Sequence, residues 1–500
     1  MASLTVSLGP ETDLSCERVD RAARDRSTRI DVTRAADDAL RRSRRALDAV
    51  RERGDEVYGL TTGFGPLVDQ TAAPEPSVQA NQLLDHLSTG SGNWAAPDVA
   101  RAMVLARLQS LAQGHSGARP STVHALADLL DAAPPPAVPE IGSLGASGDL
   151  TPLAHAARAY AGQGHLLNDD GSLLNADAAL QAADLSPVSF DARDALSFVN
   201  GTSFTTGTAA LALSRGRRLL ERAEALTGWA YRLLGCSLEA LAPRLHAARG
   251  HAGQEDSAAA IRAEATRNGS AEQDCRPLQE VYSLRCAPQV LGAARDQLAY
   301  ARSLIETELN GANDNPIIDP EAPAALHGGN FQAQQVGFAA DALTEALTQV
   351  GVLAERQIDV LLSPDQNGGA PPLLAWQPGP TSGLAGAQLT ATALVAELRH
   401  NAEMAATSSI PTNNDNQDVV SMGALAARSA HKQTERLAPI LAVLGLSLAQ
   451  LTHLRDAGRA EGPASAFPSW MPSVDPIVDD RPLRTEIAAL AARWRLPTNA

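Results

Sequence analysis

Apolar residues recur with a helical period over most of the chain, and the first clear pattern covers residues 31–54. It ends at Gly54, a residue type that commonly closes helices because it adopts left-handed backbone angles without strain. Three shorter helices are predicted over residues 77–90, 98–114 and 119–131. Prolines between residues 134 and 139 then interrupt the pattern, and a stretch rich in Asn, Asp and Gly near 165–190 is compatible with a small hairpin.

Longer helical patterns dominate the rest of the chain. They are predicted over residues 205–247, 276–308, 330–362, 382–407, 421–457 and 480–495. A helix of about twenty residues spans roughly 30 Å, so these segments are long enough to form a bundle and to reach partner chains. We predict a mainly α fold, with a long central helix bundle over residues 196–500 and a smaller N-terminal part over residues 1–195, acting together as one catalytic unit. The polar clusters fall in the connecting loops, where binding residues concentrate.

Composition and charge narrow the classes of function. The chain has 500 residues, 3% aromatics and a formal net charge of −16, which argues against a nucleic-acid partner. The basic run RRSRR at 41–45 lies among aspartates and is interpreted as a solvated helix face. The cysteines form no CxxC pair and the N-terminus has no signal-peptide pattern, so a cytoplasmic location is expected. The most apolar stretch, 437–451, contains Pro439 and is too short to span a bilayer, so we expect a buried helix and no membrane partner.

The tripeptide Ala146-Ser147-Gly148 offers an unusual chemistry. Gly148 has an unhindered amide and tolerates the strained angles of a tight turn, so its nitrogen can attack the Ala146 carbonyl. Loss of water from the resulting ring and from the Ser147 hydroxyl leaves a conjugated five-membered ring with an exposed methylene. That methylene is an electrophile, which none of the twenty side chains offers. Taken alone, however, the tripeptide is more simply explained as a Gly/Ser turn.

Further motifs along the chain favour the reactive tripeptide over a plain turn. In chain order they are YGLTTGFG (58–65), GSLGASGDLTPLAH (142–155), VNGT (199–202), HAARGHAGQ (246–254), LQEVYSLRCAPQV (278–290), NDNP (313–316), HGGNFQ (327–332) and NQDVVSMG (416–423). On these motifs the sequence resembles the aromatic amino acid ammonia-lyase/aminomutase family, which uses a 4-methylidene-imidazol-5-one (MIO) prosthetic group. The resemblance implies that MIO forms autocatalytically from Ala146, Ser147 and Gly148, without metal or nucleotide. It also implies the fumarase/aspartase-like helical fold and a homotetramer with shared active sites.

The resemblance assigns further roles residue by residue. Tyr58 would remove the β-proton of the substrate, Asn200 would hydrogen-bond the MIO oxygen, and Asp149 would assist cyclisation. Tyr282 would be the remaining catalytic residue. It would line the amine and carboxylate end of the substrate together with Gln279, Asn413 and Gln417. The substrate-binding residues would be Gly65, His86, Leu87, Gln279, Arg285, Phe331, Asn413 and Gln417. Arg285 would grip the carboxylate, a task suited to a bidentate guanidinium, and the loop around Phe64 and Gly65 would form a lid.

Each of these residues has a simpler interpretation when the resemblance is set aside. Tyr58 is then a half-buried tyrosine bonded to the backbone, Arg285 an ion-pair partner, Asn200 and Asn413 turn or cap residues, and Phe331 part of the core. A tyrosine base also has a physical requirement. Because its ordinary pKa is near 10, a positive local field, such as that of converging helix N-termini, is needed to ionise it.

The residue pair His86-Leu87 indicates the substrate. In this family histidine-specific members resemble Ser-His at this place, phenylalanine-specific ones Phe-Leu and tyrosine-specific ones His-Leu; Gly90 and Gly92 set the register. An imidazole can hydrogen-bond a phenolic hydroxyl, and a site built for a hydroxyl discriminates against the analogue that lacks it. Gln417 stands where histidine-specific members have Glu, which argues against histidine. We therefore expect L-tyrosine as the aromatic amino acid substrate and trans-4-coumarate as the product.

Other functions remain open from the sequence. A tyrosine 2,3-aminomutase that makes β-tyrosine would share the same site, and an L-phenylalanine ammonia-lyase is a third possibility. A non-catalytic helical scaffold would show no MIO. A hydrolase built on Ser147 or Ser203 is disfavoured because no GxSxG elbow is present. No HExxH motif or Cys/His cluster is seen, so no metal is expected.

Overall fold

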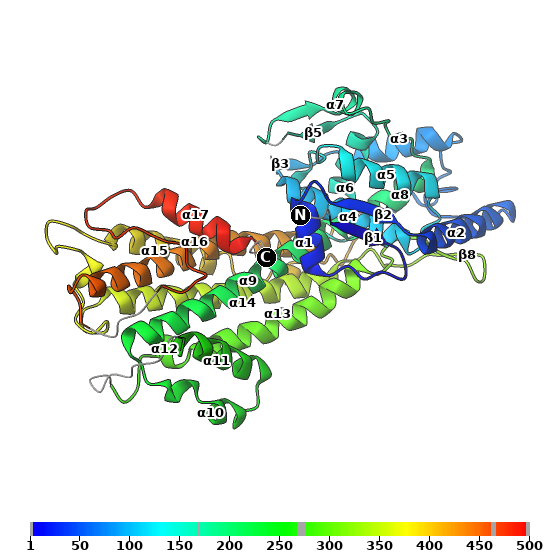
Figure 1. The fold of residues 1–500 in the computed structure, drawn as a ribbon. Coiled ribbons are helices and arrows are strands. Elements are labelled where there is room, and N and C mark those ends of the chain that lie inside the picture. The colour runs from blue at the N-terminus through cyan, green and yellow to red at the C-terminus, as the bar shows by residue number, and fades with distance from the viewer. Residues whose placement is uncertain (1–3, 169, 268–276, 462–466, 497–500) are drawn as a thin grey trace. The chain divides into compact units, whose positions relative to one another are not determined.

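The computed structural model describes residues 4–168, 170–267, 277–461 and 467–496, and these form two compact units (Figure 1). Unit 1 comprises Met1–Ser214, Ala301–Asp341 and Met404–Arg428, and unit 2 comprises Arg215–Tyr300, Ala342–Glu403 and Ser429–Ala500. Four long helices contribute residues to both units: α9 (Ser203–Leu234), α13 (Ala287–Leu309), α14 (Gln334–Leu362) and α16 (Gly423–Asp456). The predicted mainly α fold is confirmed, while the division at residue 195 stays a prediction.

Unit 1 combines short helices with two-stranded sheets. Its helices are α1 (Cys16–Arg24), α2 (Arg34–Glu52), α3 (Pro76–Leu87), α4 (Pro97–Ala112), α5 (Pro120–Ala132), α6 (Leu150–Tyr160), α7 (Ala176–Ala182) and α8 (Ala192–Val199), with the short 3-10 turns η1 (Gly65–Leu67) and η4 (Ala405–Thr407). Its strands are β1 (Thr5–Leu8), β2 (Arg29–Val32), β3 (Ser91–Trp94), β4 (Pro139–Ile141), β5 (His165–Leu167), β6 (Leu173–Asn175), β7 (Ile317–Asp319) and β8 (Ala324–Leu326). β1 and β2 pair in parallel, and the other three pairs are antiparallel. α3 packs against α6 and α8, which places the loops at their ends next to one another.

The helix ends of unit 1 follow the local sequence. Thr33 caps α2 by accepting a hydrogen bond from the Ala36 amide, and α2 is followed by Gly54 at a φ of +79°. The predicted hairpin is found as β5 and β6, and α7 follows it directly. The first thirty residues, which show no clear period in the sequence, include β1 and α1. α1 is capped by the Ser15 side chain, and Val19 is fully buried.

Unit 2 is built mainly from helices. Besides the parts of the long helices, it contains η2 (Leu238–Leu241), α10 (Pro243–Ala247), α11 (Ala252–Ala265), α12 (Tyr282–Arg285), η3 (Pro372–Leu374), α15 (Ala385–His400) and α17 (Arg484–Arg495). Buried amides link its helices: Gln357 donates to Thr227 over 3.0 Å, and Gln433 donates to Thr348 over 3.0 Å. The predicted helix over 205–247 was too long, because α9 ends at Leu234 and Gly235 has a φ of +68°.

The most apolar segment lies inside α16, as the sequence predicts. By length and composition alone, this helix is the one candidate membrane span among the described residues. However, 89% of its apolar window is buried within the protein, and Pro439 lies inside the helix. The segment therefore has the character of a core helix.

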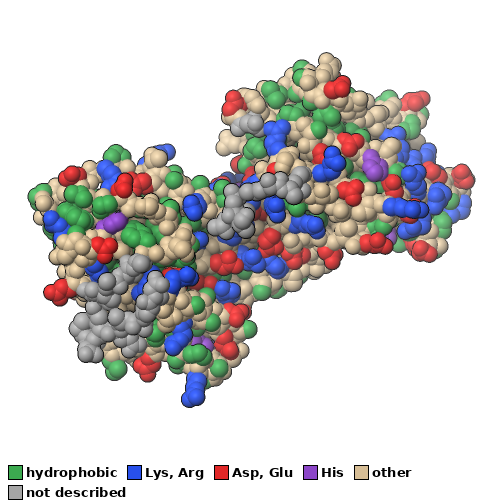
Figure 2. Space-filling model, viewed as in Figure 1, with side chains coloured by type: hydrophobic (Ala, Val, Ile, Leu, Met, Phe, Trp, Pro, Cys, Tyr) green, Lys and Arg blue, Asp and Glu red, His purple; other side chains and the backbone are tan. Residues whose placement is uncertain are grey.

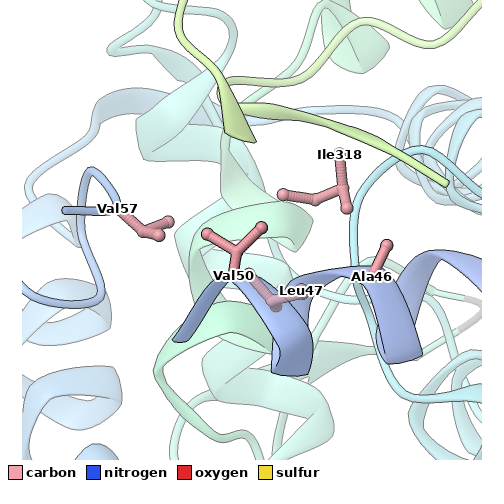
Figure 3. Packing of buried hydrophobic residues seen from close by; sticks show 5 residues of the cluster. All are labelled: Ala46, Leu47, Val50, Val57 and Ile318. Carbon is pink, nitrogen blue, oxygen red and sulfur yellow. The ribbon is translucent and has the colours of Figure 1, made fainter. Parts of the chain in front are cut away.

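Helix α2 carries the RRSRR run on one side and packs into the core on the other. Arg41 and Arg44 lie near Asp37 and Asp48 at i,i+4 spacing, and Figure 2 shows basic and acidic side chains intermixed over this helix. The RRSRR run is therefore a helix face with acidic neighbours. On the opposite side α2 buries Ala46, Leu47 and Val50 against Val57 and Ile318 (Figure 3). This cluster, called here the α2 cluster, anchors the chain immediately before Tyr58.

Candidate active site

A cavity of about 850 Å³ in unit 1 gathers most of the residues proposed from the sequence. Nine of them line it: Tyr58, Gly65, His86, Leu87, Ser147, Asn200, Phe331, Asn413 and Gln417. Ala146 and Gly148 flank Ser147 and are buried, whereas Ser147 is partly exposed. The folded chain therefore presents the serine of the tripeptide to the cavity.

The loop carrying Tyr58 closes on itself. The Tyr58 hydroxyl accepts a hydrogen bond of 2.8 Å from the Gly65 amide, and its ring meets Phe64 edge-on at 6.2 Å between centroids. The loop is also held from outside, because the Tyr58 amide donates to His327 Nε2 over 3.1 Å. Gly65 has a φ of +56°, and a Cβ there would lie 2.8 Å from the Asn413 side chain. Only glycine therefore fits this point of the loop without strain.

Ala146, Ser147 and Gly148 form a tightly packed turn. Gly148 has a φ of +77°, and a Cβ added there would lie 2.5 Å from the Gly201 nitrogen. The Gly145 carbonyl, just before the turn, accepts bonds from the Ala333 amide and from the Ser421 hydroxyl. Ala146 packs with Val420 and Met422 in a small apolar cluster. The turn is thus held between segments that lie far apart in the sequence.

Asn200 and Gln417 both contact Ser147. The Asn200 side-chain amide donates to the Ser147 carbonyl oxygen over 2.7 Å, and the Gln417 side-chain amide donates to the Ser147 hydroxyl over 2.8 Å. Asn200 is the C-terminal cap residue of α8, which accounts for the turn interpretation from sequence. The structure adds that its side chain is directed at the tripeptide.

A short hairpin whose turn residues have left-handed backbone angles positions Asn413 and Gln417. Thr412 and Gln417 exchange backbone hydrogen bonds across it, and Asn413, Asn414 and Asp415 all have φ between +55° and +57°. Asn and Asp tolerate these angles better than other residues with a Cβ. The run of Asn and Asp in this motif therefore has a conformational cause in addition to any role at the site.

The hydrogen bonding of His86 restricts what it can recognise. Its Nδ1 lies 2.9 Å from the Gln82 carbonyl oxygen, one turn earlier in α3. A carbonyl only accepts, so Nδ1 carries the proton in this contact. In the neutral imidazole Nε2 then has a free lone pair and can only accept a hydrogen bond. His86 on the cavity wall is therefore suited to a ligand that donates one.

Burial changes the proton affinity of two groups at the site. Burial raises the pKa of Tyr58 above its ordinary value of 10.0, and the Gly65 amide opposes this shift weakly. Among the described residues, burial is therefore the dominant influence on the proton affinity of Tyr58. Burial also raises the pKa of Asp149, against hydrogen bonds from Ser143 and Thr205. A carboxyl with raised proton affinity therefore adjoins the Gly148 amide in the chain.

Three proposed residues lie in unit 2 and are not among the described walls of the cavity. These are Gln279, Tyr282 and Arg285. Arg285 Nε donates to the Glu280 carbonyl over 2.9 Å, and its guanidinium lies 4.6 Å from the centre of the Tyr282 ring. Tyr282 is 70% exposed. The assignment of these residues to the substrate carboxylate stays a prediction.

Several residues at the site were not singled out from the sequence. Leu83, Leu150 and Leu196 supply apolar wall, and their helical spacing gives no sign that they face a cavity. Asn315 lines the cavity and accepts a bond from the Gly328 amide, while His327 supports Tyr58. Both residues lie in motifs noted above, NDNP and HGGNFQ, and their place in these motifs is the sequence feature that could have identified them.

A mainly α fold and an Ala-Ser-Gly turn beside a cavity that also holds a tyrosine agree with the carbon–nitrogen lyase class, which the family and the relatives below establish. The chain belongs to the aromatic amino acid lyase family, whose model matches residues 14–467. The family membership and enzyme class predicted from the motifs are thereby confirmed.

Individual relatives are similar over nearly the whole chain. A tyrosine ammonia-lyase of Cereibacter sphaeroides is 44% identical over 93% of this chain and 92% of its own length. An MIO-dependent tyrosine 2,3-aminomutase of Streptomyces globisporus is 40% identical over 91% of this chain and 88% of its own length. The crystal structure of a tyrosine aminomutase from the same organism has a TM-score of 0.89, 36% identity, and coverage of 98% and 97% of the two chains.

Proposed function

We propose that this chain is a tyrosine ammonia-lyase that eliminates ammonia from L-tyrosine to give trans-4-coumarate. The observation that supports this most is the convergence of Ser147, Asn200, Tyr58 and His86 on one cavity. Relatives named tyrosine ammonia-lyase at 44% and 39% identity support the same substrate. The predicted cytoplasmic location belongs to this proposal.

The tripeptide fits the prosthetic group that the family implies. Only glycine can occupy position 148, Ser147 opens to the cavity, and the Asn200 amide already contacts the carbonyl oxygen of Ser147. Asp149 follows Gly148 directly in the chain and is bonded to Ser143 and Thr205, and burial raises its pKa, which suits a group that accepts a proton during cyclisation. When formed, MIO supplies an electrophilic methylene for the substrate amine, which none of the twenty side chains offers.

The other residues bind the substrate and move a proton. His86 Nε2 accepts the phenolic hydrogen of L-tyrosine, while Leu87 and Phe331 line the cavity around the ring. The Tyr58 oxygen accepts the β-proton, a general-base step. Asn413 and Gln417 bind the amino-acid end together with Gln279, Tyr282 and Arg285.

We further propose that the chain works as a homotetramer with shared active sites. Support comes from the exposed apolar surface of the segment that holds the proposed carboxylate site, where Leu278 is 92% and Tyr282 is 70% exposed. Neighbouring chains of the assembly would then contribute to the positive field that a Tyr58 base requires. Size-exclusion chromatography with activity assays of the fractions tests this. A monomer that is fully active would contradict it.

The decisive experiment is incubation of the purified protein with L-tyrosine, followed by liquid chromatography with mass detection. Accumulation of 4-coumarate is expected, and Ser147→Ala is the matched variant that should form none. In the same samples, a peptide spanning 146–148 that is lighter by two waters reports the prosthetic group. Without that mass change in the wild type, the proposal fails.

A tyrosine 2,3-aminomutase is the second candidate, favoured by the 40% identical relative and by the aminomutase structure. It predicts β-tyrosine as the early product and coumarate as a slow by-product. An L-phenylalanine ammonia-lyase would instead turn over L-phenylalanine faster than L-tyrosine.

A further inference from the structure

Arg107 is a fully buried cation near the middle of α4, a helix buried on all sides after its first turn. Its Nη1 donates to Asn313 Oδ1 over 2.8 Å and to the Asn200 carbonyl over 3.5 Å. Its Nε and Nη2 have no hydrogen-bond partner among the described residues, and it forms no ion pair with them. Burial lowers the pKa of Arg107 to about 10, which leaves the group charged at neutral pH. The carboxyl groups of Asp314, Glu308 and Asp149 favour its charged form electrostatically without bonding to it directly. A buried cation without a directly bonded carboxylate is costly to keep, so its position requires an explanation.

The contacts of Arg107 converge on the turn formed by Asn200, Gly201 and Thr202. A Cβ at Gly201 would lie 1.6 Å from Arg107 Nη1, so the guanidinium lies directly against this glycine. Beyond the glycine, the Thr202 hydroxyl donates to Glu308 over 2.5 Å. Asn313 joins the two sets of contacts, because it accepts from Arg107 and its amide donates to Glu308 over 3.1 Å.

This turn contacts the tripeptide at two points. Asn200 donates its side-chain amide to the Ser147 carbonyl over 2.7 Å, and the Gly201 carbonyl accepts a 2.7 Å hydrogen bond from the Asp149 amide. Any displacement of the 200–202 turn therefore moves both the Asn200 amide that donates to Ser147 and the Gly201 carbonyl that accepts from Asp149. In the described contacts, Arg107 is separated from the Ser147 carbonyl by a single residue, Asn200.

We propose that Arg107 is a positioning residue that fixes the 200–202 turn against Ala146-Ser147-Gly148 and adds positive charge behind the Ser147 carbonyl. Cyclisation needs the tripeptide atoms held in reacting geometry, and small displacements lower such rates strongly. A nearby cation also stabilises negative charge that develops on an oxygen in a water-poor site. The inference rests on the proposed function only for the chemistry at 146–148.

The test compares Arg107→Met and Arg107→Lys with Arg101→Met. Arg101 is a matched control because it lies in the same helix, is 3% exposed, and donates to the backbone carbonyls of Ala22, Ala23 and Leu130, which do not line the cavity. Circular dichroism and thermal unfolding report folding. Peptide mass reports cyclisation of 146–148 without substrate, and steady-state assays separate kcat from KM.

For Arg107→Met we expect incomplete cyclisation and a kcat lower by about a hundredfold, with a KM for L-tyrosine within about threefold of the wild type. Arg107→Lys, which retains the charge, should recover cyclisation and part of kcat. Arg101→Met should lose stability but cyclise fully. Full cyclisation with kcat equal to that of the Arg101 variant would overturn the proposal, and so would equal loss in both methionine variants.

A second variant keeps the inference testable if Arg107→Met does not fold. Thr202→Val removes the hydroxyl that bonds Glu308 and is expected to lower kcat about tenfold; unchanged kcat and full cyclisation would contradict the role of the turn. A wild-type chain that never cyclises would reject the proposed function itself. A cyclised wild type with equally cyclised and active Arg107 variants would reject this inference alone.

Discussion

Two loops meet at the cavity, and they are held in different ways. The loop 142–149 is bonded to remote segments: Gly201 and Thr205 hold Asp149, and Ser421 and Ala333 hold Gly145. The loop 58–65 has bonds within itself, most clearly that between the Tyr58 hydroxyl and the Gly65 amide, and is held from outside by Gln79 and His327. Contacts from distant segments fix atoms for a reaction within the chain, whereas local contacts allow a loop to open as a unit. On the proposed function, the first loop reacts with itself and the second, which makes more of its bonds locally, admits the substrate.

The largest expected effect comes from the first loop. Ser147→Ala removes the hydroxyl whose loss creates the methylene, so we expect kcat for L-tyrosine to fall by about 10⁴-fold or more. Product formation is measured by liquid chromatography. Ser172→Ala, in the exposed hairpin of the same unit, is the control and should keep full activity. Substantial activity of the Ser147 variant would mean that the tripeptide is only a turn.

The Tyr58→Phe variant tests whether the two loops act independently. It should lower kcat by about 10³-fold, because a general base is lost, while the 146–148 peptide still loses two waters. Tyr160→Phe is the control, since Tyr160 is buried in α6 and does not line the cavity. Incomplete cyclisation in the Tyr58 variant would show that the loops are not independent.

His86→Phe tests recognition of the substrate side chain by a residue of the cavity wall. The ratio of kcat/KM for L-tyrosine over L-phenylalanine should fall by about a hundredfold, because the acceptor for the phenolic hydrogen is removed. In the wild type, 4-amino-L-phenylalanine should be a better substrate than its 4-methoxy analogue, since only the amino group donates. His124→Phe, at a helix residue paired with Asp37, should leave both ratios unchanged.

The pH dependence reports the environment of Tyr58 in the assembled enzyme. Burial favours the neutral phenol and raises its pKa above 10.0, so the ionised base becomes more abundant as pH rises. If no other charge intervenes, kcat/KM should increase about tenfold per pH unit from neutral pH toward about pH 10. A plateau below about pH 9 that persists with substrates of different amine pKa would show instead that positive potential at the site lowers the pKa of Tyr58.

The smallest effect is expected in the α2 cluster that anchors the Tyr58 loop. Ile318→Val removes one methylene from a fully buried side chain and should cost about 1 kcal/mol of unfolding free energy. Chemical denaturation measures this, with Ile30→Val in β2 as the control. If anchoring matters for the base, kcat should fall in the Ile318 variant and not in the control.

Much of the fold was accessible from the sequence, because long helices have a strong periodic signal. The ends of the helices were harder to predict. For example, α9 ends at Leu234 because Gly235 adopts left-handed angles, which the surrounding apolar pattern does not reveal. β1 and α1 were missed because short elements carry little periodicity. Among site residues, Tyr58, Ser147 and Asn200 were found through motifs, whereas Arg107 lay in a plain helical stretch.

The sequence by itself determined the helical class, the family and the candidate chemistry, since these depend on local periodicity and on motifs in fixed order. Only the tertiary structure decided which groups touch: Asn200 on the Ser147 carbonyl, Gln417 on its hydroxyl and Arg107 against Gly201. It also showed that burial raises rather than lowers the Tyr58 pKa within unit 1. Contacts between residues far apart in the chain, and the burial that shifts proton affinities, arise from packing in three dimensions and leave no periodic trace in one.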